Sequence, residues 1–329
     1  MKRFFGQIAR ALWLAIGAGV AYGLLARVFY YAQALEPLFV VMSVGFIFLM
    51  PLALGYITVS LAPPRPWWQR MLLPWIPGVL LVGTALLVGW EGSLCIVMAL
   101  PIFLVMGSLG GLVAGWIGQG TRGTTQLSAL IFIALLPYLV TPLELRSRPP
   151  TQIRSVATAI VIDAPAATVW EQIIRVPAIQ PDELGVTPVN LMGIPRPVEA
   201  TLSHEGIGGV RHATFEHGVT FVETITAWEP QRGLAFSIAA QAETMTSPDL
   251  NGQIVVGGEF FDALDGRYTI EPRGPDQVVL HLTSDHRLAT RFNPYAGLWT
   301  DFIMRSTQNN ILQVIKARCE AAPQPESTL

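Results

Sequence analysis

Charged residues are scarce in this chain. They make up 13% of its 329 residues, while 51% are hydrophobic, and a soluble domain carries roughly 25% charged residues. The deficit lies in one half: of the 21 basic and 23 acidic residues, residues 1–145 hold seven and three, which leaves 14 and 20 for residues 146–329. We therefore expect two domains, a membrane half followed by a soluble half.

Cysteine and metal-binding patterns are also nearly missing. The two cysteines, Cys95 in an apolar stretch and Cys319 near the C-terminus, provide neither a disulfide framework nor metal-ligand spacing. We interpret both as packing residues. The five histidines form no HExxH or comparable signature, and no nucleophile elbow or phosphate loop stands out. We predict no metal and no cofactor.

The soluble half has no excess of positive charge. Its 14 basic and 20 acidic residues give a formal charge of about −6. Because phosphate binding needs a basic face, we exclude nucleic acid as a partner.

Long apolar runs are what the first half does contain. Each is about 17 to 24 residues long, enough to cross a hydrocarbon core of about 30 Å. A cleavable signal peptide is the rival interpretation of the first run, but it lacks a small-residue cleavage site and a second run follows at once. We predict an all-α transmembrane bundle of about five helices over residues 1–146. The runs lie near 10–30, 38–61, 72–90, 94–117 and 126–143.

Basic residues in the loops of this half suggest its orientation. They cluster before the first run, between the second and third, and between the fourth and fifth, which places these loops in the cytoplasm by the positive-inside rule. Five crossings then give an integral multi-pass protein of a bacterial inner membrane, with a cytoplasmic N-terminus and a periplasmic or extracellular soluble domain; miscounting one span reverses this. The residues are Lys2, Arg3, Arg10, Arg65, Arg70 and Arg122.

A stiff linker separates the halves, because Arg148-Pro149-Pro150 resists both helix and sheet. We assign residues 147–153 to it. The β-rich stretch Ser155 to Ile162 then predicts a strand, and Asp163-Ala164-Pro165 ends that strand with a helix-start signal.

Further strands and one long helix complete the soluble half. Asn293-Pro294 opens a helix that runs to about Glu320. Residues 321–329 are expected to be a disordered tail. A curved antiparallel sheet around the C-terminal helix would bury one apolar face of each element, so we predict an α+β domain over residues 154–320. The strand candidates are Val198–His204, Gly209–His217, Val219–Trp228, Gly233–Ala239, Gly266–Glu271 and Gln277–Asp285.

Three segments of this half carry a family resemblance: IVIDAPAATVWEQI, GVRHATFEHGVTFVETITAWEPQRGLAFSI and ILQVIKARCE. Together they resemble the START-related superfamily of polyketide cyclases, dehydrases and lipid-transfer proteins (SRPBCC), over about residues 152–320. The resemblance implies a helix-grip fold with an apolar cavity between the sheet and the long helix. A multi-pass membrane half is outside the usual pattern of that family.

Alternation along Val219–Trp228 places Phe221, Glu223 and Ile225 on the more apolar face, which we expect to line the cavity. A buried carboxylate needs a partner or a raised pKa, and the inverted register, with Glu223 in solvent, stays open. The candidate partners are Arg211, His212, Arg267 and His281. The full set of expected cavity residues is Phe221, Glu223, Ile225, Leu280, Trp299, Phe302 and Ile303.

Glu223, His281 and Asp285 are the candidates for catalysis. His281 lies among apolar residues, and Asp285 precedes His286 at the end of the same strand. A histidine beside an aspartate suggests general acid–base work, but salt bridging at a strand end is the readier explanation of the pair.

Two loops, Gln180–Pro197 and Ser247–Phe261, carry apolar residues that look exposed. In a tethered domain they could form the cavity mouth or touch the bilayer; ordinary loop packing is the alternative. The residues are Leu191, Met192, Ile194, Ile254 and Val255.

The hypothesis for function is membrane-tethered binding or transfer of a lipid or other apolar small molecule, with the bilayer as second partner. One alternative is a membrane-bound cyclase or dehydratase acting on a polyketide-like or isoprenoid substrate. Another is a ligand-sensing scaffold protein.

Overall fold

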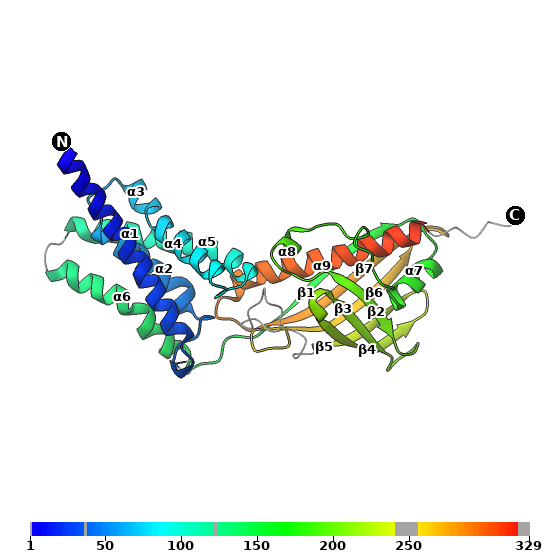
Figure 1. Cartoon of the computed structure of the whole chain (residues 1–329). Helices are drawn as coiled ribbons and strands as arrows, with labels where there is room; N and C mark the ends of the chain where they lie inside the picture. The colour runs from blue at the N-terminus through cyan, green and yellow to red at the C-terminus, as the bar shows by residue number, and fades with distance from the viewer. Residues whose placement is uncertain (1, 36–37, 121–123, 241–255, 322–329) are drawn as a thin grey trace. The chain divides into compact units, whose positions relative to one another are not determined.

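The computed structural model describes residues 2–35, 38–120, 124–240 and 256–321. The chain divides into two compact units, Met1–Pro149 (unit 1) and Pro150–Leu329 (unit 2). Figure 1 shows unit 1 as helices and unit 2 as a sheet with one long helix. The α-helical and α+β character expected for the two halves is therefore observed.

In the described part of unit 1, four stretches are long and apolar enough to cross a membrane: Gln7–Tyr31, Trp67–Leu87, Ser93–Gly118 and Thr124–Glu144. The remaining expected span is the shorter apolar helix Gly45–Leu61. Its first turns, Gly45–Leu49, are π-helical. The helices of unit 1 are α1 (Lys2–Tyr31), η1 (Gln33–Leu35), η2 (Gly45–Leu49), α2 (Met50–Leu61), α3 (Trp67–Leu72), α4 (Trp75–Leu87), α5 (Ser93–Gly120) and α6 (Thr124–Glu144).

Glycine lets two of these helices approach closely. A Cβ on Gly55 of α2 would lie 2.0 Å from the carbonyl oxygen of Gly107 in α5, and one on Gly110 would lie 1.9 Å from the carbonyl oxygen of Leu52. Small residues at helix crossings let the two backbones pack closely, and such packing stabilises helix pairs in lipid, where the hydrophobic effect does not act between them. The contact between α2 and α5 therefore depends on these two glycines.

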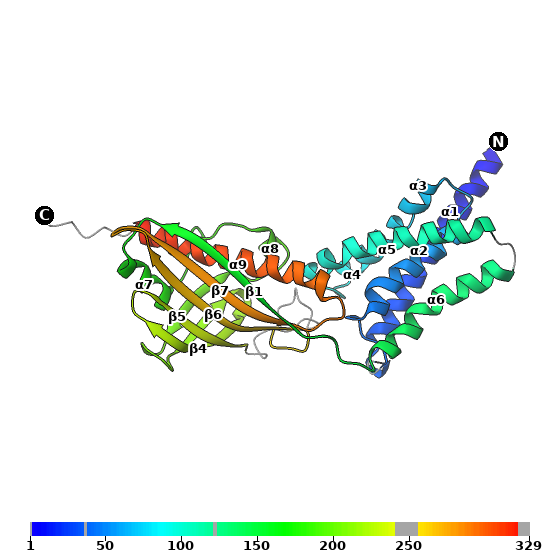
Figure 2. The same cartoon turned by 180° about the vertical axis from the view of Figure 1, so that it is seen from behind.

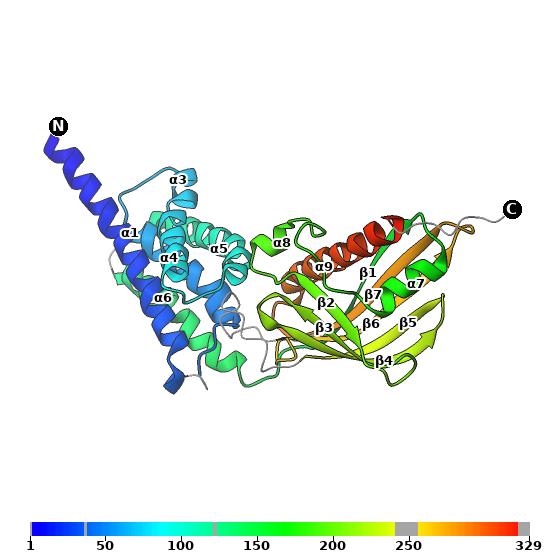
Figure 3. The same cartoon turned by 45° about the vertical axis from the view of Figure 1, so that its right-hand side comes forward.

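Unit 2 is a seven-stranded antiparallel sheet in the order β1-β7-β6-β5-β4-β3-β2. The sheet curls around α9, with β1 and β7 alongside the helix (Figures 2 and 3). This is the predicted helix-grip arrangement. The elements are β1 (Gln152–Ile162), α7 (Ala166–Ile174), α8 (Pro188–Leu191), β2 (Pro197–Leu202), β3 (Val210–Phe215), η3 (Glu216–Gly218), β4 (Thr220–Glu229), β5 (Gly233–Ala240), β6 (Phe261–Pro272), β7 (Val278–Leu288) and α9 (Asn293–Ala321).

Local signals account for most of these boundaries. Helix α7 starts directly after Pro165, its N-cap. The hairpin between β3 and β4 turns through His217 and Gly218, which have φ angles of 61° and 76°. One element differs from expectation: α8 lies inside the predicted loop Gln180–Pro197. Its four residues are too short for apolar periodicity, and a capping box between Thr187 and Asn190 defines it instead.

Candidate functional site

The inner face of the sheet changes character along β1 and β7. These strands pair from Ile162 opposite Val278 to Arg154 opposite His286. At the first end the inward side chains form a closed apolar core with α7 and the second half of α9. At the other end, beside the first half of α9, the inward side chains are polar. The core includes Ile162, Trp170, Leu280, Leu282, Leu312 and Ile315.

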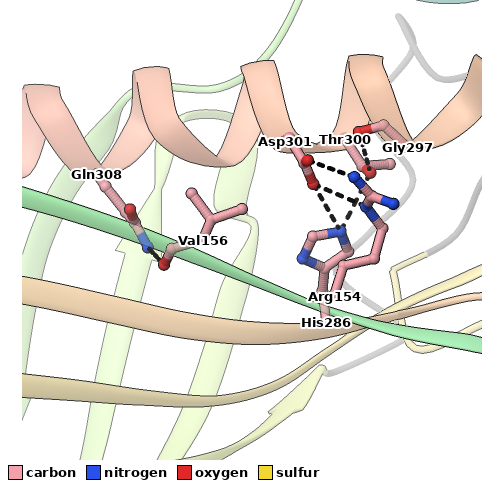
Figure 4. A network of polar contacts seen from close by, with 7 residues as sticks. All are labelled: Arg154, Val156, His286, Gly297, Thr300, Asp301 and Gln308. Atoms are coloured by element: carbon pink, nitrogen blue, oxygen red, sulfur yellow. Dashed lines mark hydrogen bonds and ion pairs between the residues drawn. The ribbon is translucent and has the colours of Figure 1, made fainter.

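Gln308 of α9 marks the change from apolar to polar. Its side-chain amide is buried and donates to the backbone oxygen of Val156 at 3.1 Å and to Ser284 Oγ at 3.0 Å. Its amide oxygen accepts a hydrogen bond from Thr158 Oγ1 at 3.1 Å. Figure 4 shows the contact with Val156 beside the larger polar network. Gln308 thus fixes α9 to both β1 and β7.

Arg154, Asp301 and His286 form the main polar network (Figure 4). Arg154 binds Asp301 through two hydrogen bonds, Nε to Oδ1 at 2.9 Å and Nη2 to Oδ2 at 2.5 Å. Gly297 provides the room, because a Cβ there would lie 2.7 Å from the guanidinium carbon of Arg154. His286 Nε2 lies 3.1 Å from Thr300 Oγ1 and 3.8 Å from Asp301 Oδ1.

The imidazole of His286 is fully buried, with an exposed fraction of 0%. Burial lowers its pKa below the ordinary histidine value. The pKa of Asp301 is also lowered, chiefly because Arg154 donates hydrogen bonds to its carboxylate. His286 Nδ1 is buried and has no hydrogen-bond partner in the described part of the chain. The ring is therefore neutral and keeps one unused nitrogen, which points away from Asp301 in Figure 4.

A second inner polar cluster lies across the sheet on β3 and β4. Arg211 and Glu223 are direct cross-strand partners, and Arg211 Nη1 donates a hydrogen bond to Glu223 Oε2. Their exposed fractions are 4% and 7%. The guanidinium carbon of Arg211 lies 5.7 Å from the ring centroid of Phe236. The Phe236 ring packs over Gly266, which has to be glycine because a Cβ there would lie 2.5 Å from Phe236 Cζ.

Burial dominates the electrostatics of this cluster. Burial raises the pKa of the Glu223 carboxyl. The positive charge of Arg211 lowers the same pKa, but by less. The hydroxyl oxygen of Tyr268 accepts a hydrogen bond from Arg211, and burial raises the pKa of Tyr268 as well. Arg211 Nε is buried without a hydrogen-bond partner among the described residues. A charged pair with one donor unused, set in an apolar face, is costly for stability and is typical of functional sites.

The three candidate catalytic residues are not brought together. Glu223 is buried on the inner face, the side that strand alternation predicts, and Arg211 is the partner among the four considered. His281 occupies an outward position on β7, where its Nε2 lies 3.1 Å from Glu271 Oε2 at the surface. Asp285 is also on the outward side of β7, opposite Asp265 of β6. Two strands, β6 and β5, separate β7 from β4.

The expected cavity residues also divide. Ile225 and Leu280 belong to the closed core, and Phe221 packs against Phe215 with ring centroids 5.3 Å apart. Trp299 and Ile303 are half-buried, and Phe302 has an exposed fraction of 43%.

The expectation that Phe302 lines the cavity is therefore wrong. The reason lies in α9 itself: its first turns bury the small residues Ala296 and Gly297 against the sheet. The larger apolar residues of those turns are left on other faces. The prediction that the largest apolar residues of α9 face the sheet therefore fails in its first turns.

Among the candidate loop residues, Leu191 has an exposed fraction of 77%. Met192 is buried, which corrects the expectation that it is exposed, because α8 turns its side chain inward. Ile194 is half-buried. Ile254 and Val255 lie outside the described residues.

Sequence reasoning missed Arg154, Asp301 and Gln308 as site residues. One signal for this polar end was present: in VVLHLTSDHRL, Ser284 and His286 share the strand phase of Leu280 and Leu282. Polar residues in the inward phase of a strand need partners. Within residues 2–35, 38–120, 124–240 and 256–321, no three His, Cys, Asp or Glu side chains cluster as metal ligands would.

No family model matches this sequence, and no curated protein matches it significantly. Many solved structures are similar to about half of the chain, and three of them follow. Truncated norcoclaurine synthase from Thalictrum flavum is 11% identical, with 54% of this chain and 99% of that chain covered and a TM-score of 0.34. A START superfamily protein from Mycobacterium smegmatis is 14% identical, with 50% of this chain and 97% of that chain covered and a TM-score of 0.33. The Zhui aromatase/cyclase from Streptomyces sp. R1128 is 14% identical, with 51% of this chain and 94% of that chain covered and a TM-score of 0.32.

Proposed function

We propose that unit 2 binds a lipid or other apolar small molecule between its curled sheet and α9, while the apolar helices of unit 1 anchor it in a membrane. The observation that supports this most is the buried Arg211–Glu223 pair with its unused Arg211 Nε. An oxygen atom on an otherwise apolar ligand would accept a hydrogen bond from that nitrogen.

The surroundings of the pair favour such a ligand. The cluster sits on the same inner face as Ile225 and Phe236, so a bound molecule would meet apolar side chains over most of its surface. Ligand sites commonly combine an apolar lining with a few polar groups that fix orientation. Arg211 would orient the ligand, and the apolar face would supply most of the affinity.

Anchoring would place the binding domain beside the source of its ligand. A molecule dissolved in the bilayer and a domain tethered to it meet at a high effective concentration. Five crossings would put unit 2 on the side opposite the N-terminus, in the periplasm of a bacterial inner-membrane protein, and four would put both on one side. Labelling of single cysteines at Ile8 and at Leu191 with an impermeant maleimide in intact cells distinguishes these topologies.

The test of binding uses the full chain in detergent, analysed by native mass spectrometry with lipid extraction. We expect one apolar molecule per chain to be retained. The variant Arg211→Met/Glu223→Leu should retain less of it, and Ile207→Ala, a change at an exposed position outside the candidate sites, should retain as much as the wild type. If the wild type binds nothing after exposure to source membranes, the binding proposal fails.

A second candidate function is a cyclase or dehydratase that uses Glu223 as an acid. The raised pKa of its buried carboxyl favours this candidate. It requires the retained molecule to be converted by the wild type, and Glu223→Gln to bind it without turnover. Equal turnover by Glu223→Gln and the wild type would remove the candidate.

A further inference from the structure

The outward line of α9 changes composition along its length. Near the start of the helix it carries Leu298 and Phe302, with exposed fractions of 67% and 43%. Further along the same line the exposed residues are Arg305, Asn309 and Gln313. Because these positions recur every three or four residues, they lie on one face of the helix.

Aromatic rings extend the apolar part of this line. The Trp299 ring lies 6.5 Å from that of Tyr295 and 6.4 Å from that of Phe302, centroid to centroid. We call Tyr295, Leu298, Trp299 and Phe302 the aromatic stripe. Their spacing of three, four and seven residues forms a single face of about two turns. Trp and Tyr, which join an apolar body to a polar tip, are enriched where membrane meets water.

The start of α9, next to the stripe, is bound to the first residue of unit 2. Asn293, the first residue of α9, donates from Nδ2 to the backbone oxygen of Pro150 at 2.7 Å. After α6 ends, hydrogen bonding continues to Ser147, whose N–H donates to the oxygen of Glu144 at 3.3 Å. Three residues from Ser147 to Pro150 span at most about 11 Å. Three residues of chain therefore connect the turns that follow α6, a helix long enough to cross a membrane, to the residue that binds the start of α9.

Charge around the stripe favours an anionic membrane surface. Residues 291–305 contain Arg291 and Arg305 but one acid, Asp301, and that acid is bound by Arg154. This local excess of positive charge stands in a half-chain whose formal charge is about −6, from 14 basic and 20 acidic residues. Basic residues close to a negatively charged leaflet are attracted to it.

We propose that the aromatic stripe of α9 lies in the interfacial layer of the bilayer that the apolar helices of unit 1 would cross. The surface is separate from the inner face of the sheet, so unit 2 contacts the membrane whether or not it binds a ligand there. The stripe would fix the first half of α9 at the interface and leave Asn309 and Gln313 in water.

The test places an environment-sensitive fluorophore at single cysteines in the full chain. The background is Cys95→Ala, with Cys319 left in place because it is buried. Leu298→Cys is the test position, and Gln313→Cys is the matched control on the same helix, about 22 Å further along at 1.5 Å per residue. The protein is reconstituted in phosphatidylcholine vesicles with and without phosphatidylglycerol, some containing brominated acyl chains.

We expect the label at position 298 to emit at shorter wavelength and to be quenched by the brominated lipid, more strongly with phosphatidylglycerol present. The label at position 313 should be quenched by aqueous iodide alone. Quenching of position 298 by iodide would overturn the proposal. So would protection from both quenchers, which would mean that unit 1 or a second copy of the chain covers the stripe.

A second variant removes the apolar character of the stripe without touching the sheet. In Leu298→Glu/Phe302→Glu, a label on Tyr295→Cys should lose its quenching by brominated lipid, while the unchanged stripe should keep it. Equal lipid quenching in both backgrounds would show that position 295 reaches the bilayer for another reason, and the proposal would fail.

Discussion

The two ends of the inner face of unit 2 are built on different principles. The end around Leu280 and Ile315 is apolar and closed, and its side chains satisfy one another by packing alone. The end around His286 and Arg211 is polar, and each of these residues keeps a buried nitrogen without a partner in the described part of the chain. The difference teaches that one inner face combines apolar side chains satisfied by packing with polar side chains that keep an unused hydrogen-bond capacity.

The largest effect should come from dividing the buried ion pair. Arg211→Met leaves the Glu223 carboxylate buried without its partner, which should lower the free energy of unfolding by about 3–5 kcal/mol. Arg211→Met/Glu223→Leu removes both charges and should unfold near the wild-type midpoint. Thermal unfolding of the full chain in detergent checks both. Equal losses in the single and double variants would mean that packing of the arginine, not charge, stabilises this end.

At the apolar end, Leu280→Ala should cost about 2–5 kcal/mol of unfolding free energy, because it opens a cavity in a fully buried cluster. The matched control, Leu191→Ala at an exposed position, should stay within about 0.5 kcal/mol of the wild type. Denaturant midpoints give both values. A small loss for Leu280→Ala would show that the apolar end is less tightly packed than its burial indicates.

His286 should make the polar end sensitive to acid. The folded protein holds this ring neutral with a lowered pKa, so the unfolded chain binds the proton more readily. Stability is therefore present above the ordinary value of 6.5 and is lost as pH falls below it. His286→Gln keeps a donor near Thr300 and carries no titrating group, so its melting temperature should vary less between pH 7 and pH 5. Parallel curves for both proteins would contradict this.

The smallest effect is expected for the ion pair at the surface side of the polar end. Asp301 and Arg154 have side chains about a quarter exposed, so Asp301→Asn should cost about 1 kcal/mol, the upper range for exposed pairs. The lowered pKa of Asp301 means that its contribution is lost as pH falls through the folded value. The difference between Asp301→Asn and the wild type should therefore shrink in strong acid, as melting temperatures would show.

Elements governed by local chemistry were predictable from the sequence. Strand alternation, the Asp163-Ala164-Pro165 stop and the Asn293-Pro294 start act within a few residues, and α9 and most strands lie near the positions that these signals predict. Strand β6 is an exception, because it begins at Phe261 and not at Gly266. The inward phase of Glu223 followed from the same alternation. Fold class and the face of this side chain were accessible because neighbours in sequence determine them.

Features set by distant residues were not predictable. Arg211 was one of four possible partners of Glu223, and pairing of β3 with β4 selects it. Asp301 and Arg154 are 147 positions apart. In α9, apolar residues lie on more than one face, so size alone could not tell that Ala296 and Gly297 turn inward. Where a helix has two apolar faces, only the packed structure decides which is covered.

The pairing of β1 has a mechanical consequence. This strand directly follows Pro150, and all of its residues from Gln152 to Ile162 pair with β7. A pull directed along β1 from Pro150 would be perpendicular to its hydrogen bonds to β7. All of these bonds would then share the force in shear. A strand peeled from its far end would break them one after another. The attachment of β1 to β7 therefore resists a pull along the strand axis better than it resists peeling.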